Sequence, residues 1–161
     1  MKNKNNSLQT ESYVIAANAS CGTHEGHLTC TLDMAIDKHL LVAAGSANGQ
    51  VKTCGPKDVP MGVAMDNGSA GDVVDVALLG LTNETLLMRT NDAIKMGDWV
   101  YSTDRGRVIT HVPETTDVRY LVGMAIASAP AGGLVEVNTC LPQETRVFCK
   151  EDMERLQSKK A

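Results

Sequence analysis

Four residues near the N-terminus carry side chains that could bind a metal ion, at a spacing of three: Cys21, His24, His27 and Cys30. Thiolates and imidazoles are the ligands that zinc prefers. Zinc sites usually take two ligands from each of two separated turns, however, and in a strand this spacing would send Cys21 and His27 to one face and His24 and Cys30 to the other. The sequence therefore favours a polar segment without metal, and a zinc site is the alternative.

Sequence templates for catalysis are missing. The chain has no G-x-S-x-G elbow, phosphate-binding loop, G-x-G-x-x-G or H-E-x-x-H. Cys54, Cys140 and Cys149 have no neighbouring histidine or cluster of bases that would activate a thiolate. His39 and His111 stand alone in apolar or mixed segments, which is typical of structural histidines. We predict that the protein is not an enzyme and uses no cofactor.

Composition excludes several classes of partner. The 15 basic and 19 acidic residues give a net charge of −4, which offers no general attraction for nucleic acid or anionic lipid. Aromatic side chains make up only 3% of the chain, too few for a base-stacking surface. No apolar run approaches the ~20 residues that cross a bilayer. With five cysteines and no signal-like start, we expect reduced thiols and synthesis in the cytoplasm of the host cell, with neither nucleic acid nor a membrane as partner.

Many short apolar runs, separated by turns such as SANG, DNGSAGD, TDRG and PAGG, predict a mainly β protein. In DVVDVALL, Val74 and Val76 alternate with Asp75 and Ala77, which indicates a strand with one wet face. We divide the chain into a flexible N-terminal arm and loop (1–30), a single β domain (31–149) and a short C-terminal helix or tail (150–161).

Two segments have helical patterns. In KEDMERLQSKK, Met153 and Leu156 share one side, and Glu151 precedes Arg155 by four residues. A weaker helical candidate is TLLMRTNDAI, at 85–94. We predict one short helix at the C-terminus.

The chain contains an internal repeat. Shifted by 61 positions, Gly62, Ala64, Gly71, Val74 and Val76 meet Gly123, Ala125, Gly132, Val135 and Val137. Upstream, the GQVKT segment at Gly49 meets the GRVIT segment at Gly106 with an offset of 57. The repeat, at about 41–80 and 98–141, predicts two related β units. We expect them to pack into one small barrel or sandwich with one core, in which Trp99 is buried.

Charge is unevenly distributed. Between Lys57 and Arg89 there is no basic residue but there are five acidic ones, whereas 146–160 carries five basic and three acidic residues. Either these are ordinary solvated surfaces, or they provide complementary contacts between copies or with a larger partner.

The segments LLVAAGSANGQV, GVAMDNGSAGDVVDVALLG, AIKMGDWVYSTDRGRV and VGMAIASAPAGGLVEV resemble the phage capsid cement proteins, also called head decoration proteins. In that family a segment like GDWVY, which starts at Gly97, is followed by a Gly-x-Val turn and a Val-Gly-x-Ala strand. The resemblance covers about 36–140. The CGTHEGHLTC segment before it and the charged segment after it depart from the family pattern.

The resemblance implies a structural protein on the outer surface of an assembled virion. It would reinforce contacts between subunits of the major capsid protein of a phage head, as a homotrimer. Candidate contact residues lie in the arm and on two exposed turns: Lys2, Lys4, Tyr13, Asp66, Asn67, Asp72, Arg105 and Arg107.

Two other functions stay open. One is a small metal-binding β-barrel enzyme or binding module that uses Cys21, His24, His27 and Cys30. The other is a self-associating scaffold or adhesion module unconnected with viruses.

Overall fold

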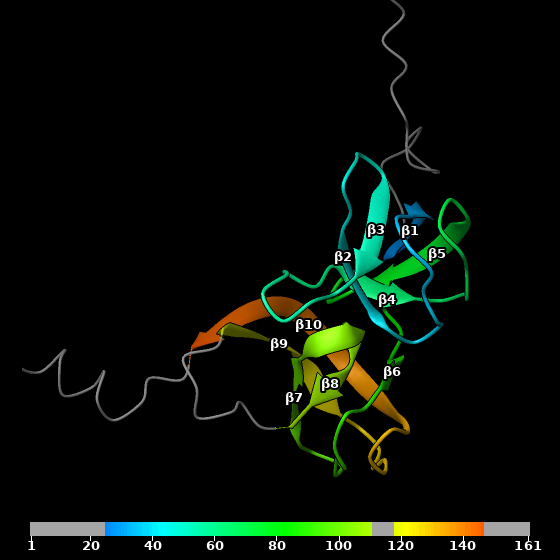
Figure 1. Ribbon diagram of the computed structural model, residues 1–161. Helices are drawn as coiled ribbons and strands as arrows, with labels where there is room; N and C mark the ends of the chain where they lie inside the picture. Colours follow the sequence, from blue (N-terminus) through cyan, green and yellow to red (C-terminus); the bar gives the residue numbers. More distant parts are fainter. Residues whose placement is uncertain (1–24, 111–117, 147–161) are drawn as a thin grey trace, which may run out of the picture.

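The computed structural model describes residues 25–110 and 118–146 (Figure 1). The predicted C-terminal helix and most of the predicted arm lie outside these residues. No helix in the described ranges is long and apolar enough to cross a membrane. The elements in chain order are β1 (His27–Leu32), β2 (Leu41–Ala44), β3 (Gln50–Thr53), β4 (Gly62–Ala64), β5 (Val73–Leu78), β6 (Leu86–Arg89), β7 (Trp99–Ser102), a 3-10 turn η1 (Asp104–Gly106), β8 (Val108–Ile109), β9 (Val118–Ala125) and β10 (Leu134–Arg146). The fold is mainly β, as the sequence predicts.

Strands β1 to β5 form a closed barrel, here barrel 1, in the order β1-β3-β2-β4-β5. Strand β1 closes it by pairing antiparallel with β5, from His27 opposite Ala77 to Thr31 opposite Val73. On its other side β1 runs parallel to β3. The remaining pairs are antiparallel. Closure removes the open strand edges of this unit.

Strands β6 to β10 form a second five-stranded sheet, here barrel 2, in the order β6-β10-β9-β7-β8. Its two end strands meet at one parallel bridge, between Thr90 and Val108. Each strand of barrel 1 has a counterpart five strands later in the chain, from β1 and β6 to β5 and β10. Counterpart strands have counterpart neighbours in the two barrels, including the parallel contact between the first and third strands. The two repeats therefore fold with the same topology.

Hydrogen bonds repeat along with the strands. In barrel 1, the Lys38 N–H donates to Asn67 Oδ1 at 2.8 Å. In barrel 2, the Met96 N–H donates to Ser128 Oγ at 3.0 Å. The two donors are 58 positions apart and the two acceptors 61 apart. Each repeat unit thus begins with its first strand, earlier than position 41 or 98.

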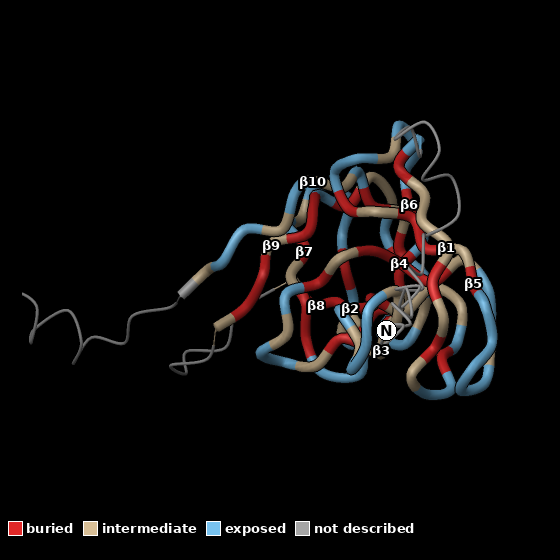
Figure 2. The backbone as a smooth tube through the Cα atoms, turned by 90° about the horizontal axis from the view of Figure 1, so that it is seen from above, coloured by how far each residue is buried: buried red, intermediate tan, exposed pale blue. Residues whose placement is uncertain are grey.

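The two units do not share one barrel, which corrects the expected single core. One buried cluster fills barrel 1, and a second joins the outward face of barrel 1 to the interior of barrel 2. Buried segments run through both barrels in Figure 2. The first cluster contains Cys30, Leu32, Ile36, Val42, Val51, Ala64, Val74 and Val76. Two cores form because barrel 1 closes around its own apolar side chains, while the interior of barrel 2 packs on the outward face of barrel 1.

The outward face of barrel 1 is buried at the junction of the barrels. Leu41, Val63 and Ala77 are 0% exposed there, although they alternate with residues that point into barrel 1. The predicted wet face of β5 is therefore wrong at Ala77, because barrel 2 covers it. Backbone bonds cross the junction: the Gly106 N–H donates to the Cys54 carbonyl at 2.8 Å, and the Arg89 N–H to the His39 carbonyl at 3.0 Å.

Two predicted boundaries differ from the structure. Strand β1 begins at His27, inside the segment predicted as arm and loop (1–30). The TLLMRTNDAI segment is not a helix but contains β6. Leu86 and Met88 point inward and are buried while Leu87 is 42% exposed, the two-residue period of a strand. Helical spacing in so short an apolar run did not distinguish helix from strand.

Candidate interaction surface

Two members of the proposed zinc set lie on β1, His27 and Cys30. The Cys30 side chain points into the barrel 1 core, whereas His27 points outward and bonds Asp75, with 2.7 Å between Nδ1 and Oδ2. One ion therefore cannot reach both side chains. Cys21 and His24 lie outside the described residues, within which no group of three or more possible ligands could hold a metal. The zinc alternative stays a prediction, for elemental analysis of purified protein and of Cys30→Ser to test.

Three cysteine thiols are described, and none is activated. Burial, reinforced by the Asp75 carboxylate, raises the pKa of Cys30. Burial together with the Asp58 carboxylate raises the pKa of Cys54 to about 12. Burial also raises the pKa of Cys140. Because the thiolate is the nucleophile, these groups act as small apolar side chains.

We expect Cys54 to resist alkylation in the folded protein. With a pKa of about 12 its thiolate fraction at pH 8 is about 10⁻⁴, and its side chain is fully buried beneath the turn at Gly55. The measurement is iodoacetamide labelling read by peptide mass spectrometry, with and without denaturant. Cys140, which is partly exposed, is the internal comparison and should label first. Equal labelling of the two in native buffer would contradict this.

The predicted acidic contact turn joins β4 to β5 and carries Asp66, Asn67 and Asp72, all exposed. Asn67 Oδ1 accepts the backbone bond from Lys38, and Asp72 Oδ2 accepts one from the Ser69 N–H at 2.8 Å. Asn67 and Asp72 line a shallow hollow of about 380 Å³. These two side chains thus hold the loop in shape, whereas Asp66 has no such bond among the described residues.

The predicted basic contact turn carries Arg105 and Arg107 and lies at the junction of the barrels. The Arg105 side chain is 85% exposed and its Nε lies 3.9 Å from Asp104 Oδ2. Between the two arginines, Gly106 is buried against β2, where an added Cβ would lie 2.6 Å from the Leu41 carbonyl oxygen. Packing of Gly106 on barrel 1 fixes the backbone of this turn.

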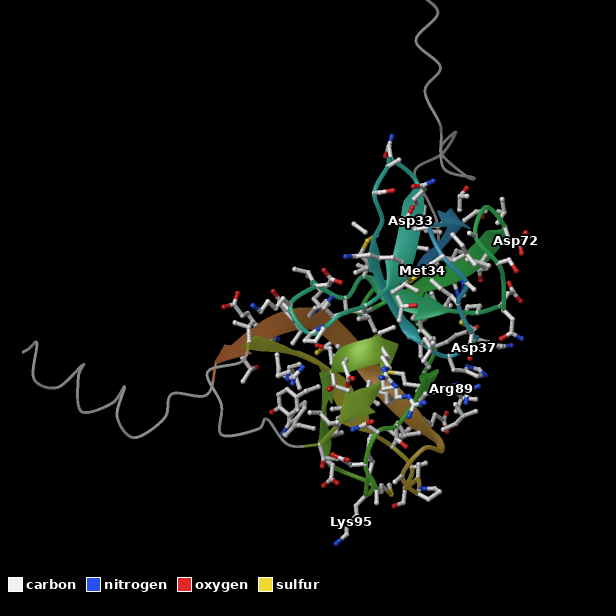
Figure 3. The ribbon with its side chains drawn as sticks, viewed as in Figure 1. Asp33, Met34, Asp37, Asp72, Arg89 and Lys95 are labelled. Atoms are coloured by element: carbon white, nitrogen blue, oxygen red, sulfur yellow. The ribbon has the colours of Figure 1, made fainter. Side chains whose placement is uncertain are left out.

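Acidic residues predominate on barrel 1. Figure 3 shows Asp33, Asp37 and Asp72 on this barrel, and Arg89 and Lys95 on barrel 2. From residue 25 to residue 80 the acidic side chains are Glu25, Asp33, Asp37, Asp58, Asp66, Asp72 and Asp75, against Lys38, Lys52 and Lys57. Lys52 pairs with Asp58 at 3.1 Å. The remaining surface of barrel 1 is therefore mainly negative.

An apolar surface lies on the outside of barrel 2. Trp99 is 54% exposed, which corrects the prediction that it is buried. It stands opposite Met124 on β9, and Leu87 and Leu134 are exposed on β6 and β10. We call Leu87, Trp99, Met124 and Leu134 the outer apolar face. In the register of the sheet, Met124 is the cross-strand partner of Asn138, and Leu87 is the cross-strand partner of Glu136. The four apolar side chains thus share the outward surface of the sheet with Arg89, which pairs with Leu134, and with Glu136 and Asn138.

Sequence reasoning missed the outer apolar face because an apolar residue in a strand is usually buried. The signal was present in the alternation of β7. In the alignment of the two repeats, Val100 corresponds to Val42, whose side chain points into barrel 1. Because side chains alternate along a strand, Trp99 must point outward, as Leu41 does. Only the packing of the barrels separates Leu41, which is covered, from Trp99, which is not.

Comparison with known proteins now decides the family. Residues 21–141 match the family described as phage cement protein. The chain belongs to this family. The match includes residues 21–30, so the predicted departure of the CGTHEGHLTC segment from the family pattern is wrong. No curated protein matches the chain.

A solved structure has the same fold. It is the crystal structure of the head fiber gp8.5 N base in bacteriophage phi29, with a TM-score of 0.56 and 19% sequence identity. The match covers 74% of this chain and 98% of that one. As a member of the cement family, the chain described here is a capsid-associated decoration protein and a component of the virion.

Proposed function

We propose that the protein binds the outer surface of an assembled phage head as a homotrimer and reinforces contacts between major capsid subunits. It is made in the host cytoplasm, has no catalytic activity and uses no cofactor. The observation that carries the proposal is the family match across both repeat units. What the described residues offer is shape and charge, in two small barrels joined by a buried cluster.

Two features of the molecule suit attachment to a repeating shell. Its joined barrels form one body whose backbone turns are fixed by internal bonds, so binding loses little conformational entropy. Several copies held together bind a repeating surface more tightly than each alone, even when a single contact is weak. Modest contacts at each turn therefore suffice.

We propose that the contacts come from the arm and from the two exposed turns. Lys2, Lys4 and Tyr13 lie outside the described residues. On the turns, Asp66 and Arg105 are the best candidates, because both are exposed and neither holds its loop through a side-chain bond to the backbone. Asn67 and Asp72 support the acidic turn, and Arg107 is the second, partly exposed arginine of the basic turn.

Co-sedimentation with purified empty heads of the matching phage tests the proposal. We expect the protein to pellet with these heads at a fixed ratio to the major capsid protein, and to raise the temperature at which the heads fall apart. Heads of an unrelated phage are the control. Absence of saturable binding would overturn the proposed function and leave the non-viral scaffold as the alternative.

Removing residues 1–12 is expected to leave the fold intact and to weaken attachment. This segment is polar, with Lys2 and Lys4 among its residues, and a segment that orders on contact can extend the binding surface. The measurement is occupancy on heads against protein concentration, with circular dichroism as the check on folding. The matched control is the full-length chain with Lys2→Ser and Lys4→Ser. It separates the effect of the positive charges on attachment from the effect of the length of the segment. Unchanged occupancy after truncation would exclude the arm from attachment.

A further inference from the structure

The chain contains two Asn-Gly pairs, each on a turn of barrel 1 with its asparagine exposed: Asn48–Gly49 and Asn67–Gly68. An asparagine followed by glycine readily loses its side-chain amide, because the backbone nitrogen of the next residue attacks the amide carbon and glycine has no side chain to obstruct it. The attack requires that this nitrogen and the amide are both free to move. The two turns differ in this respect.

The Asn67–Gly68 pair is held at both reacting groups. Asn67 Oδ1 accepts the bond from the Lys38 N–H at 2.8 Å, and the Gly68 N–H donates to the Ile36 carbonyl at 3.0 Å. The Gly68 backbone is also closely packed, since an added Cβ would lie 2.6 Å from Leu32 Cδ1. Reaction at this pair therefore requires that both hydrogen bonds open first.

The Asn48–Gly49 pair is held at neither group. The Gln50 N–H donates to the Ala47 carbonyl at 3.1 Å, which closes a four-residue turn with Asn48 and Gly49 at its centre. Gly49 has the positive φ (+77°) that a type II turn requires at its third position. Among the described residues, no hydrogen bond involves the Asn48 side chain, the Asn48 carbonyl or the Gly49 N–H. The peptide group that has to rotate for the attack is therefore unrestrained.

We infer that Asn48 is a site of spontaneous modification, at which the folded protein converts its own amide to a carboxylate. Solvent hydroxide removes the Gly49 N–H proton, and the nitrogen forms a bond to Asn48 Cγ. The bond from Cγ to Nδ2 breaks, and the amide takes up a proton from water and leaves as ammonia. Water then opens the cyclic imide at either carbonyl, to aspartate or to isoaspartate. Neither step needs an enzyme, an oxidant or a cofactor.

The products change barrel 1 in charge. Each converted copy gains one negative charge, in a chain whose net charge is −4 and on a barrel whose surface is already mainly negative. The fresh and the converted protein are therefore separable by ion exchange without unfolding.

Isoaspartate also changes the backbone, because the main chain then runs through the side chain of residue 48 and the turn becomes one atom longer. The turn continues into the contact that closes barrel 1. The Gly49 carbonyl accepts a bond from the Thr31 N–H of β1 at 2.9 Å, next to the pair of Thr31 with Gln50. We therefore expect isoaspartate to weaken the parallel pairing of β1 with β3.

Incubation of the full chain in mildly alkaline buffer, followed by tryptic peptide mass spectrometry, tests the inference. The two pairs fall on separate tryptic peptides, 39–52 and 58–89, and fragment spectra identify the converted residue in each. Two hydrogen bonds that have to open first slow a reaction by about 30-fold, so Asn48 should lose its amide about 30-fold faster than Asn67 in the folded protein. In urea both restraints are absent and the two rates should become similar.

Asn48→Gln and Asn48→Asp are the matched variants. Asn48→Gln keeps an amide on the turn but would have to form a larger ring, so the slow appearance of a more acidic form on ion exchange should be lost. Freshly purified Asn48→Asp has the new charge without the added backbone atom. It should keep the hydrogen-exchange protection of the Thr31 amide, which the isoaspartate form of the wild type should lose.

Equal rates at Asn48 and Asn67 in the folded protein would overturn the inference, and so would an acidic form that still appears in Asn48→Gln. Full protection of Thr31 in the isoaspartate form would overturn the predicted effect on barrel closure. The inference does not rest on attachment to phage heads, because the reaction is measured on the free protein. Binding to heads is measured with freshly purified, unconverted chains, so failure of one leaves the other standing.

Discussion

Gly106→Ala is expected to lower the free energy of unfolding by about 3 kcal/mol. The residue has φ +66°, where a side chain costs roughly 1–2 kcal/mol. Its new Cβ would also lie 2.6 Å from the Leu41 carbonyl oxygen, so the η1 turn has to move away from barrel 1, at roughly 1–3 kcal/mol more. The measurement is urea unfolding followed by circular dichroism.

Gly132→Ala is the matched control for this prediction. Gly132 has a similar φ of +73°, but an added Cβ there meets nothing within 4 Å. We expect it to lose only the conformational part, about 1 kcal/mol. A second readout follows from the junction: when the η1 turn shifts, the bond from Gly106 to the Cys54 carbonyl weakens, so Cys54 should label faster in Gly106→Ala alone. Equal losses of stability in the two variants would show that the close approach to Leu41 does not matter.

The sequence predicted the local elements better than their assembly. Strands and turns depend on backbone conformation and burial within a few residues. The alternation of Val74 and Val76 and the glycines of the repeat therefore indicate them correctly, and the strands form there. Whether two units share one core or close separately depends on pairing between residues far apart in the chain, such as His27 with Ala77. No local pattern contains that information, so the single core was the simplest expectation and was wrong.

The candidate surface shows the same limit. Asp66 and Arg105 were found from sequence because charged residues beside turn glycines are exposed in almost any fold. Trp99 was misplaced because composition assigns a tryptophan to the core, and only the docking of barrel 2 on barrel 1 decides which copy of the repeated surface is covered. The family resemblance identified the role of the protein, while the uncovered face became visible only with both barrels in place.

The covered copy of that surface yields the second prediction of large effect, Leu41→Ala. Leu41 is 0% exposed at the junction, and removing a buried leucine side chain costs about 2–5 kcal/mol, the larger values where the surroundings cannot close the cavity. The closed barrel on one side and the interior of barrel 2 on the other restrict such closure, so we expect a loss of about 3 kcal/mol. Urea unfolding checks this.

Trp99→Ala is the matched comparison, because Trp99 occupies the same position in the other repeat. With its side chain about half exposed, its removal should cost about 1–2 kcal/mol in a single chain, less than the removal of Leu41. The comparison requires a protein concentration low enough that wild-type chains are separate, since self-association would stabilise the folded wild type by mass action. Similar costs for the two variants in separated chains would mean that barrel 2 does not bury the surface around Leu41 as the structure has it.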